Sequence, residues 1–288
     1  MKRYVLYNPL SNNKSGSVAA EKLKELLSDS ELVFQDITKM ESYPDLFAQL
    51  DADDEIVICG GDGTLNHFAN DTKDIDYSHT ILYYAAGTGN DFLHDLDKKD
   101  GAEPFPVNQY LKHLPTVIIG ERRQLFLNGI GYGLDGYCCE VADKIKEKSD
   151  KPINYPGIAI KGLLFAYKPT SAKVTIDGVE HSFKKAWLVP TMNGRFFGGG
   201  IMITPQQKRL DNDMVSVGIV HDSSRLRTLM IFPKIFTGKH VKYTKIVEIH
   251  TGKNITVEFD RPTALQIDGE TVLNVTKYQV LSAGYSES

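Results

Sequence analysis

Hydrophobic and polar positions along the first 120 residues alternate between two periods. Short apolar runs such as RYVLY (3–7), EIVIC (55–59) and TILYYAA (80–86) predict buried strands. Between such runs, segments such as 18–29 place apolar residues at helical spacing and predict amphipathic helices. Continuous apolar strands that alternate with helices are typical of a parallel sheet covered on both faces. We therefore expect a Rossmann-like α/β domain over residues 1–120.

From about residue 121 the pattern changes to strand-like runs separated by turn residues. Asp177-Gly178 stands between two alternating runs, which is a strong signal for a β-hairpin. Helical patterns interrupt the strands at 136–148, 155–168 and 223–236. We expect an antiparallel β-sandwich with helical insertions over residues 121–288, with the last strand as a candidate to return to the first domain.

Composition narrows the classes of protein that fit. The 288 residues carry 33 Lys and Arg against 37 Asp and Glu, and a net charge of −4 argues against a generally basic nucleic-acid-binding protein. Three cysteines, two of them adjacent, cannot build a disulfide framework or a spaced zinc site, and indicate a reducing compartment. No apolar run reaches the roughly 18 residues that span a bilayer. The expected location is the cytoplasm, with any membrane contact peripheral.

Three strand-to-helix turns carry unusual residues: NPLSNNKSGS (8–17), GGDGT (60–64) and GTGND (87–91). In an open parallel sheet such turns meet at the carboxyl ends of the strands, where ligands bind. Gly60, Gly61 and Gly63 would let a polyphosphate approach the backbone, and the N–H groups that open the next helix would point at it. Asp62 would repel phosphates unless a divalent cation lies between them. The turn predicts a nucleotide with Mg²⁺, although a plain tight turn also explains a single glycine-rich loop.

Another acidic motif, Asp268-Gly269-Glu270, follows an apolar run near the end of the chain. A turn there would bring both carboxylates near one point. Phosphoryl transfer to an alcohol needs a carboxylate within reach of the attacking hydroxyl. Asp-Gly is also a common turn pair, and the residues by themselves favour a surface hairpin without a chemical role.

Taken together, these motifs resemble the diacylglycerol kinase catalytic family. GGDGT, GTGNDF, FFGGGIMITP and DGE follow one another in the family's order and cover nearly the whole chain. The resemblance implies an ATP- and Mg²⁺-dependent lipid kinase, with ATP in the cleft between two domains and the hydroxyl of a lipid, diacylglycerol first, as acceptor. An NAD kinase, which shares the GGDGT turn, and a non-catalytic lipid or nucleotide sensor of the same fold remain alternatives.

The resemblance also assigns roles to residues. The nucleotide contacts that it implies are Asn8, Thr38, Gly60, Gly61, Asp62, Gly63, Thr64, Asn66, Gly87, Thr88 and Asp91. The implied catalytic residues are Asp268, Glu270 and Asp62, the implied substrate contacts are Asp91 and Asp135, and the implied metal ligands are Asp211 and Asp213. Three positions depart from the family pattern: His67 replaces a usual glutamate, Ala86 a common proline, and Asn212-Asp213 the Asp-Gly of a metal loop.

Residues 223–247 combine six Lys and Arg, no Asp or Glu, and the apolar stretch LMIFPKIF (229–236). An apolar face flanked by cations suits an anionic membrane surface. A core helix with a solvated basic rim explains the pattern equally well. The expected partner is thus a lipid at a membrane surface and not a nucleic acid, with a homodimer left open.

Overall fold

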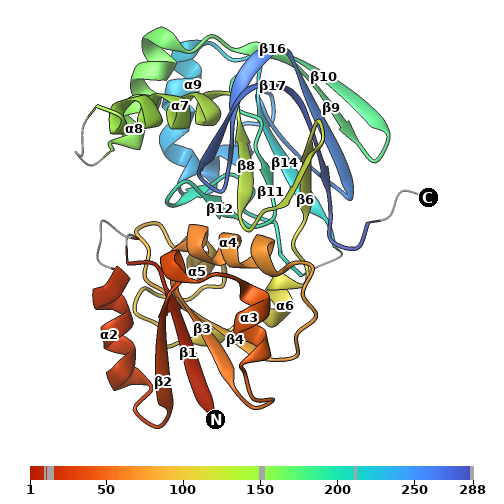
Figure 1. Ribbon diagram of the computed structural model, residues 1–288. Helices are drawn as coiled ribbons and strands as arrows, with labels where there is room; N and C mark the ends of the chain where they lie inside the picture. Colours follow the sequence, from red (N-terminus) through yellow and green to blue (C-terminus); the bar gives the residue numbers. More distant parts are fainter. Residues whose placement is uncertain (10, 12–15, 149–152, 211–212, 286–288) are drawn as a thin grey trace. The chain divides into compact units, whose positions relative to one another are not determined.

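The structure, a computed structural model, describes residues 1–9, 11, 16–148, 153–210 and 213–285 (Figure 1). The chain divides into two compact units, Met1–Lys112 and His113–Ser288. Each unit has its own sheet and its own hydrophobic core.

The first unit is a five-stranded sheet with the order β2-β1-β3-β4-β5, in which β1 to β4 run parallel and β5 is antiparallel. Its strands are β1 (Lys2–Tyr7), β2 (Glu31–Asp36), β3 (Glu55–Gly60), β4 (Thr80–Ala85) and β5 (Phe105–Pro106). Its helices are α2 (Gly16–Leu26), η1 (Ile37–Lys39), α3 (Tyr43–Ala48), α4 (Asp62–Thr72), α5 (Asp91–Asp95) and α6 (Asn108–Leu111). The expected Rossmann-like fold is confirmed, although the short strand β5 has no strand pattern in the sequence.

Helices cover both faces of this sheet. On one face Ala20 and Leu23 of α2 pack in a cluster with Val57 of β3. Successive residues of a strand point to opposite faces of the sheet. On the face opposite to α2, Tyr83 of β4 meets Phe92 of α5 edge-on, with ring centroids 5.8 Å apart. With both faces covered, the strands need no polar side, which explains their continuous apolar runs.

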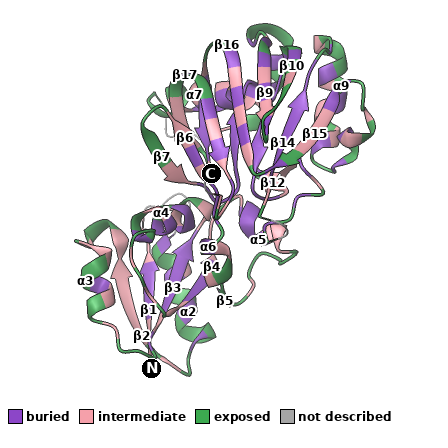
Figure 2. Ribbon diagram, turned by 90° about the vertical axis from the view of Figure 1, so that its right-hand side faces the viewer, coloured by how far each residue is buried: buried purple, intermediate pink, exposed green. Residues whose placement is uncertain are grey.

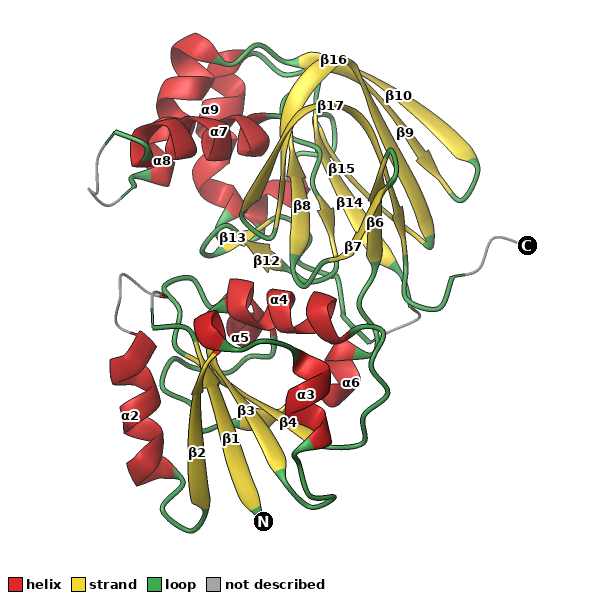
Figure 3. Ribbon diagram, viewed as in Figure 1, coloured by secondary structure: helices red, strands yellow, loops and turns green. Residues whose placement is uncertain are grey.

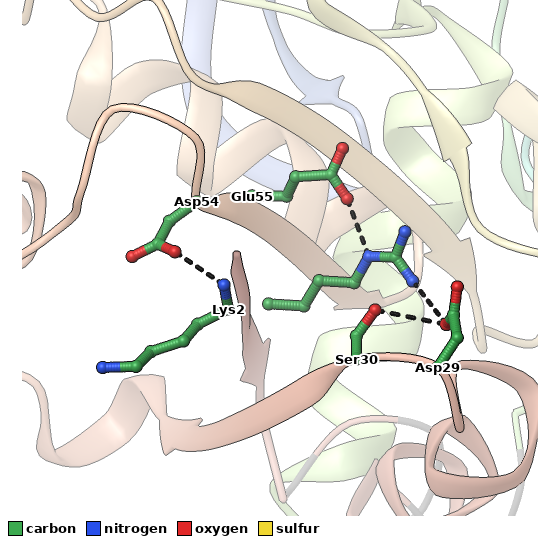
Figure 4. Close-up of polar contacts among 6 residues, drawn as sticks. Lys2, Asp29, Ser30, Asp54 and Glu55 are labelled. Carbon is green, nitrogen blue, oxygen red and sulfur yellow. Dashed lines mark hydrogen bonds and ion pairs between the residues drawn. The ribbon is translucent and has the colours of Figure 1, made fainter.

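Polar contacts hold the edge of this sheet at which the parallel strands begin (Figure 4). The backbone N–H of Lys2 donates to Asp54 Oδ1 at 2.6 Å. Arg3 Nε lies 2.7 Å from Glu55 Oε2, and Arg3 Nη1 lies 3.2 Å from Asp29 Oδ1. The side chains of Arg3 and Glu55 are only 15% and 19% exposed, so solvent screens their pair weakly. These contacts tie β1 to β3 and to the turn before β2.

The second unit is built on an antiparallel sheet with the order β15-β14-β11-β8-β16-β17-β6-β7, with β9 beside β16 and β10 beside β9 (Figure 3). Its strands are β6 (Thr116–Ile119), β7 (Arg122–Leu125), β8 (Gly129–Tyr132), β9 (Thr170–Ile176), β10 (Val179–Ala186), β11 (Thr191–Met192), β14 (Val215–Val220), β15 (Val247–Gly252), β16 (Asn254–Ile267) and β17 (Glu270–Leu281). A separate pair consists of β12 (Phe196–Phe197) and β13 (Ile201–Met202). Its helices are α7 (Leu134–Lys146), α8 (Tyr155–Lys161), the π-helix η2 (Gly162–Ala166), α9 (Arg225–Ile235) and η3 (Lys239–Lys242).

The expected β-sandwich with helical insertions is confirmed. The hairpin predicted at Asp177-Gly178 joins β9 to β10, and both turn residues have positive φ, 48° and 87°. The last strand, β17, pairs with β16 and β6 and so stays in the second unit. A second core lies under the helices, where Leu163 of η2 and Ile231 of α9 pack with Trp187. Figure 2 shows the buried residues that follow β14 and alternate with less buried ones in the first half of β16.

Strand β16 takes part in both layers of the sandwich. Its residues 255–259 pair with β9, and its residues 265–267 pair with β8. Between these halves the register against β17 shifts, which lets the strand bend. The sequence pattern predicts two separate strands here, NITVEF and ALQIDGE, and this prediction is wrong because one bent strand serves both layers.

Within the described ranges, none of the helices is both long enough and apolar enough to cross a bilayer.

Candidate functional site

The turns singled out in the sequence meet at one edge of the first unit's sheet. Asn8 follows β1, Thr38 lies just beyond β2, Gly61 follows β3, and Gly87 lies just beyond β4. These four strands are parallel and adjacent, so their carboxyl ends share one edge. The order β2-β1-β3-β4 also places the switch in winding direction between β1 and β3, where ligands bind in open α/β sheets.

Close packing of two turns explains most of the glycines. A Cβ added to Gly87 would lie 2.6 Å from the Cα of Gly61, and a Cβ added to Gly60 would lie 2.4 Å from Thr64 Oγ1. The turns after β3 and β4 therefore pack backbone against backbone. Gly63 is different, because it is exposed and a Cβ there would meet no atom of the described chain within 4 Å. The expected approach of a ligand to bare backbone fits Gly63, while Gly60, Gly61 and Gly87 have a packing reason of their own.

Asp62, the first residue of α4, connects the two turns. Its Oδ2 accepts a hydrogen bond from the backbone N–H of Phe92 at 3.2 Å, and its Oδ1 accepts one from the Tyr83 hydroxyl at 3.4 Å. Tyr83 is fully buried, and this burial, followed by the nearby Asp62 carboxylate, raises its pKa well above the usual value. The tyrosine therefore stays a hydrogen-bond donor, and the carboxylate is held in one orientation.

Asn90 shapes the second turn, and the sequence interpretation missed it. It has a left-handed backbone, with φ of 45°, at the residue before α5. Its Oδ1 accepts from the N–H of Gly87 at 3.0 Å, and its Nδ2 donates to Asp100 Oδ1 at 2.9 Å. Asparagine is both a preferred N-cap and the residue besides glycine that best tolerates this conformation, which was the available signal.

The remaining nucleotide candidates differ in exposure. Thr38 is exposed, and its hydroxyl and N–H both donate to Asp36 Oδ1, at 2.6 and 2.9 Å. This hydroxyl is the largest cause of a lowered pKa of Asp36. Asn66 and Asp91 are buried, whereas Thr88 is exposed. The carbonyl of Asn8 accepts from the N–H of Ser11 at 3.1 Å.

A cavity of about 280 Å³ lies beside the second turn, between that turn and helix α2. Gly87, Thr88 and Asn90 line it from the turn, and Lys22 lines it from α2. The lysine brings a positive charge to this cavity and Asp100 brings a negative one, so its lining carries charges of both signs. Lys22 was also missed, because a lysine on an amphipathic helix carries no positional signal in the sequence.

In the second unit, Asp268-Gly269 is the turn of the hairpin between β16 and β17, with positive φ at both residues, 46° and 93°. The hairpin that the residues favour is thus present. The Asp268 carboxylate also accepts hydrogen bonds from the backbone N–H groups of Leu127, Asn128 and Gly129, at 2.5, 2.8 and 3.0 Å. It therefore fixes the segment that leads into β8.

Glu270 opens β17, and its carboxylate lies 3.7 Å from the Arg122 guanidinium, with both side chains nearly half exposed. The structure thus gives the two acids of this hairpin different surroundings. Asp268 is held by backbone amides, while Glu270 reaches toward solvent.

Asp135, near the start of α7, lies against the same hairpin. Burial raises its pKa to about 6, and a hydrogen bond with the side chain of Gln266 opposes that shift. Gln266 is buried, and its Oε1 accepts from the N–H of Gly269 at 2.7 Å. Oδ2 of Asp135 is buried and has no hydrogen-bond partner among the described residues. Gln266 therefore connects Asp135 to the acidic turn, and it is a further residue that the sequence interpretation missed.

The predicted metal loop lies largely outside the described residues, so its assignment stays a prediction. Asp213 is exposed with φ of 44°, while Asp211 and Asn212 lie outside the described residues. The described ranges contain no group of three or more His, Cys, Asp or Glu side chains arranged to hold a metal ion.

The fold and these turns define a class of two-unit protein. Its α/β unit carries glycine-rich turns at the carboxyl edge of the sheet, and its β-sandwich unit carries an acidic hairpin. Residues 2–118 match the family model described as diacylglycerol kinase catalytic domain. Residues 128–281 match the model described as YegS C-terminal NAD kinase beta sandwich-like domain. The chain belongs to the diacylglycerol kinase catalytic family and is, by that membership, a kinase of the lipid-kinase type.

Individual relatives agree with this membership. A diacylglycerol kinase of Mycobacterium tuberculosis strain H37Rv is 25% identical over 223 residues, which cover 73% of this chain and 67% of that protein. SAS0691 of Staphylococcus aureus, a provisionally named lipid kinase, is 30% identical over 234 residues, covering 76% and 72%. The crystal structure of a diacylglycerol kinase from Bacillus anthracis matches with a TM-score of 0.61 at 19% identity, covering 98% of this chain and 94% of that one, a likeness of fold.

Proposed function

We propose that this protein transfers the γ-phosphoryl group of ATP, with Mg²⁺, to the hydroxyl of a lipid, and that diacylglycerol is the acceptor. The first unit would bind the nucleotide through Asn8, Thr38, Gly60, Gly61, Asp62, Gly63, Thr64, Asn66, Gly87, Thr88 and Asp91. The second unit would supply Asp268 and Glu270 to orient or deprotonate the acceptor hydroxyl, and Asp135 to contact the acceptor.

The placement of Asp62 is the observation that carries the proposal. This carboxylate sits at the start of α4 beside the exposed backbone of Gly63, where helix-initiating N–H groups attract anions. A carboxylate in such a place suits a ligand that brings both phosphates and a cation. Hydrogen bonds from the Phe92 N–H and the Tyr83 hydroxyl hold the carboxylate in this place.

The candidate nucleotide residues at the carboxyl ends of strands β1 to β4 fit Mg²⁺. Mg²⁺ prefers hard oxygen ligands and is commonly held by one or two carboxylates together with substrate phosphates. Asp62 and Asp91, the first residues of α4 and α5, supply carboxylates at this edge. When bound, the ion would offset the charge of the phosphates during transfer. Asp213 stays a candidate for a separate, structural ion.

The test is transfer of radiolabelled phosphate from ATP to a panel of acceptors in mixed micelles: diacylglycerol, ceramide, undecaprenol and, in solution, NAD. We expect labelled phosphatidic acid from diacylglycerol, and loss of the label with Asp62→Asn and with Glu270→Gln. Asp74→Asn, an exposed acid after α4, is the matched control and should keep full activity.

The alternatives appear as other outcomes of the same screen. Label on NAD but on no lipid would favour an NAD kinase. Heat of ATP binding in calorimetry without label on any acceptor would favour a sensor. Full activity of both acid variants would refute the proposed site.

A further inference from the structure

Three helical segments of the second unit carry large apolar side chains on the outside. Relative exposure is 80% for Phe165, 66% for Leu226, 59% for Met230, 41% for Ile160 and 37% for Leu164. These five residues, on α8, η2 and α9, are called the α8–α9 face below. A single exposed leucine on a protein surface is ordinary. Several on neighbouring helices are not, because grouped apolar exposure marks an interaction site.

Segments η2 and α9 of this face are in contact, and η2 continues α8 along the chain. The guanidinium of Arg225 in α9 donates to the carbonyl of Leu163 in η2 at 2.8 Å. Leu163 and Ile231 lie in one core cluster, so the inner sides of both helices are covered. Ile160 and Leu164 are four residues apart, as are Leu226 and Met230, so each pair lies on one side of its own helix. The outer sides therefore combine these apolar residues with the exposed Lys161 and Arg227, whereas a helix that faces only water would be polar.

The segments that form this face carry Lys and Arg but no Asp or Glu, whereas Glu140 of the neighbouring α7 lines a pocket together with Lys168. Residues 153–169 contain two lysines and no acid, and residues 223–247 contain six Lys and Arg and no acid. The whole chain has more acids than bases, 37 against 33, so this distribution is local. Arg225 and Arg227 flank Leu226, and Lys234 follows Met230 by one helical turn. Apolar side chains among an excess of cations complement a surface that is apolar inside and anionic outside.

We propose that the α8–α9 face docks the second unit on an anionic lipid bilayer. Phe165, Leu226 and Met230 would enter the interfacial layer, and the surrounding Lys and Arg would lie against the phosphate headgroups. The proposal deepens the proposed function and rests on it, since a lipid kinase must reach an acceptor that stays in the membrane.

Co-sedimentation of the full chain with vesicles tests the docking. Vesicles of phosphatidylcholine alone are compared with vesicles that also contain phosphatidylglycerol. We expect binding to the anionic vesicles that high salt reverses. The double variant Phe165→Ser/Met230→Ser should lower the partition coefficient about tenfold or more, because two apolar insertions are lost. Arg227→Glu should weaken binding to anionic vesicles only.

Val179→Ser is the matched control, because Val179 is 61% exposed on a hairpin of the same unit and lies outside the face. Its partition coefficient should equal that of the unchanged protein. Binding that ignores lipid charge, or that survives the double variant, overturns the proposal. Self-association in sedimentation velocity that Phe165→Ser abolishes would instead make the face an interface between two copies, and would also overturn it.

A soluble acceptor separates failure of docking from failure of the proposed kinase activity. The double variant should phosphorylate a short-chain, water-soluble diacylglycerol at the normal rate and lose activity only toward vesicles. Vesicle binding with the expected mutational pattern but no phosphorylation of either acceptor would refute the kinase and leave the docking intact. Normal phosphorylation in vesicles by the double variant would refute the docking and leave the kinase intact.

Discussion

The carboxylate of Asp62 accepts a hydrogen bond from the backbone N–H of Phe92, 3.2 Å away, and so joins the first residue of α4 to the start of α5. Substitutions can separate this bracing role from the role that we propose for the charge of Asp62.

Asp62→Asn should cost the first unit less stability than Asp62→Ala, because the amide oxygen can still accept from Phe92 although the amide nitrogen cannot accept from the Tyr83 hydroxyl. The loss of charge should lower phosphoryl transfer about 100-fold or more, as for other groups that stabilise the transition state electrostatically. Asp62→Ala should lose activity equally and also cost about 1 kcal/mol of folding free energy. Thermal unfolding and the transfer assay measure the two effects. Equal stability of both variants would contradict the bracing role.

Gly87→Ala and Gly63→Ala form a matched pair. The methyl group at 87 would lie 2.6 Å from the Cα of Gly61, so this change should cost about 1–3 kcal/mol by forcing the turns apart. The methyl group at 63 meets no atom of the described chain, so stability should be unchanged or slightly higher. Calorimetric titration should nevertheless show weaker ATP binding by the Gly63 variant. Normal ATP affinity there would mean that phosphates do not approach this backbone.

Asp268→Asn and Glu270→Gln should differ in stability. Asp268 accepts from three backbone amides, and removing its charge weakens all three bonds, so we expect a loss of about 1–3 kcal/mol. Glu270 pairs with Arg122 at 3.7 Å and is nearly half exposed, so its change should cost less than about 0.5 kcal/mol. Loss of transfer in Glu270→Gln at unchanged melting temperature would assign that residue to the chemistry. Retained transfer would leave Asp268 as the acid to examine.

Asp135 should make the stability of the second unit depend on pH. Its pKa rises from an ordinary 3.8 to about 6 on folding, so the folded state favours the protonated carboxyl. The contribution of this group to stability is therefore highest below pH 3.8. It falls as pH rises through 6, and above pH 6 the free energy of unfolding is about 3 kcal/mol lower. Asp135→Asn should abolish this component, which urea unfolding of both proteins between pH 4 and pH 8 would reveal. Parallel pH curves for the two proteins would contradict it.

Arg3→Met tests the opposite edge of the first unit's sheet. The guanidinium pairs with Glu55 at 2.7 Å under limited exposure, so its loss should cost about 1 kcal/mol of folding free energy. ATP affinity should not change, because the nucleotide candidates lie at the carboxyl ends of the strands. A changed ATP affinity would place the binding site elsewhere.

Local sequence patterns predicted most of the elements. A strand buried on both faces is continuously apolar, and an element buried on one face places apolar residues at a regular spacing. The apolar run 56–59 and the Asp177-Gly178 pair each determine a structure within a few residues of themselves. The glycine-rich turns and Asp62 likewise stand out by their local composition, and they lie together at the carboxyl edge of the first unit's sheet.

Contacts between residues far apart in the sequence could not be predicted from local patterns. The amides of Leu127 to Gly129 meet Asp268 about 140 residues later, and nothing local indicates this partnership. Gln266 and Asn90 act through neighbours that only the folded chain brings together. The bend in β16 was missed because a strand that changes layers has the same alternation as two strands.

Because β16 pairs with β9 along one stretch and with β8 along the next, the two layers of the sandwich share a single length of backbone. Neither layer can unfold alone without weakening the hydrogen bonds between the strands of the other. The acidic hairpin at the end of that strand thus shares the cooperativity of the whole sandwich, and the amide-bound carboxylate of Asp268 keeps its position as long as the unit stays folded.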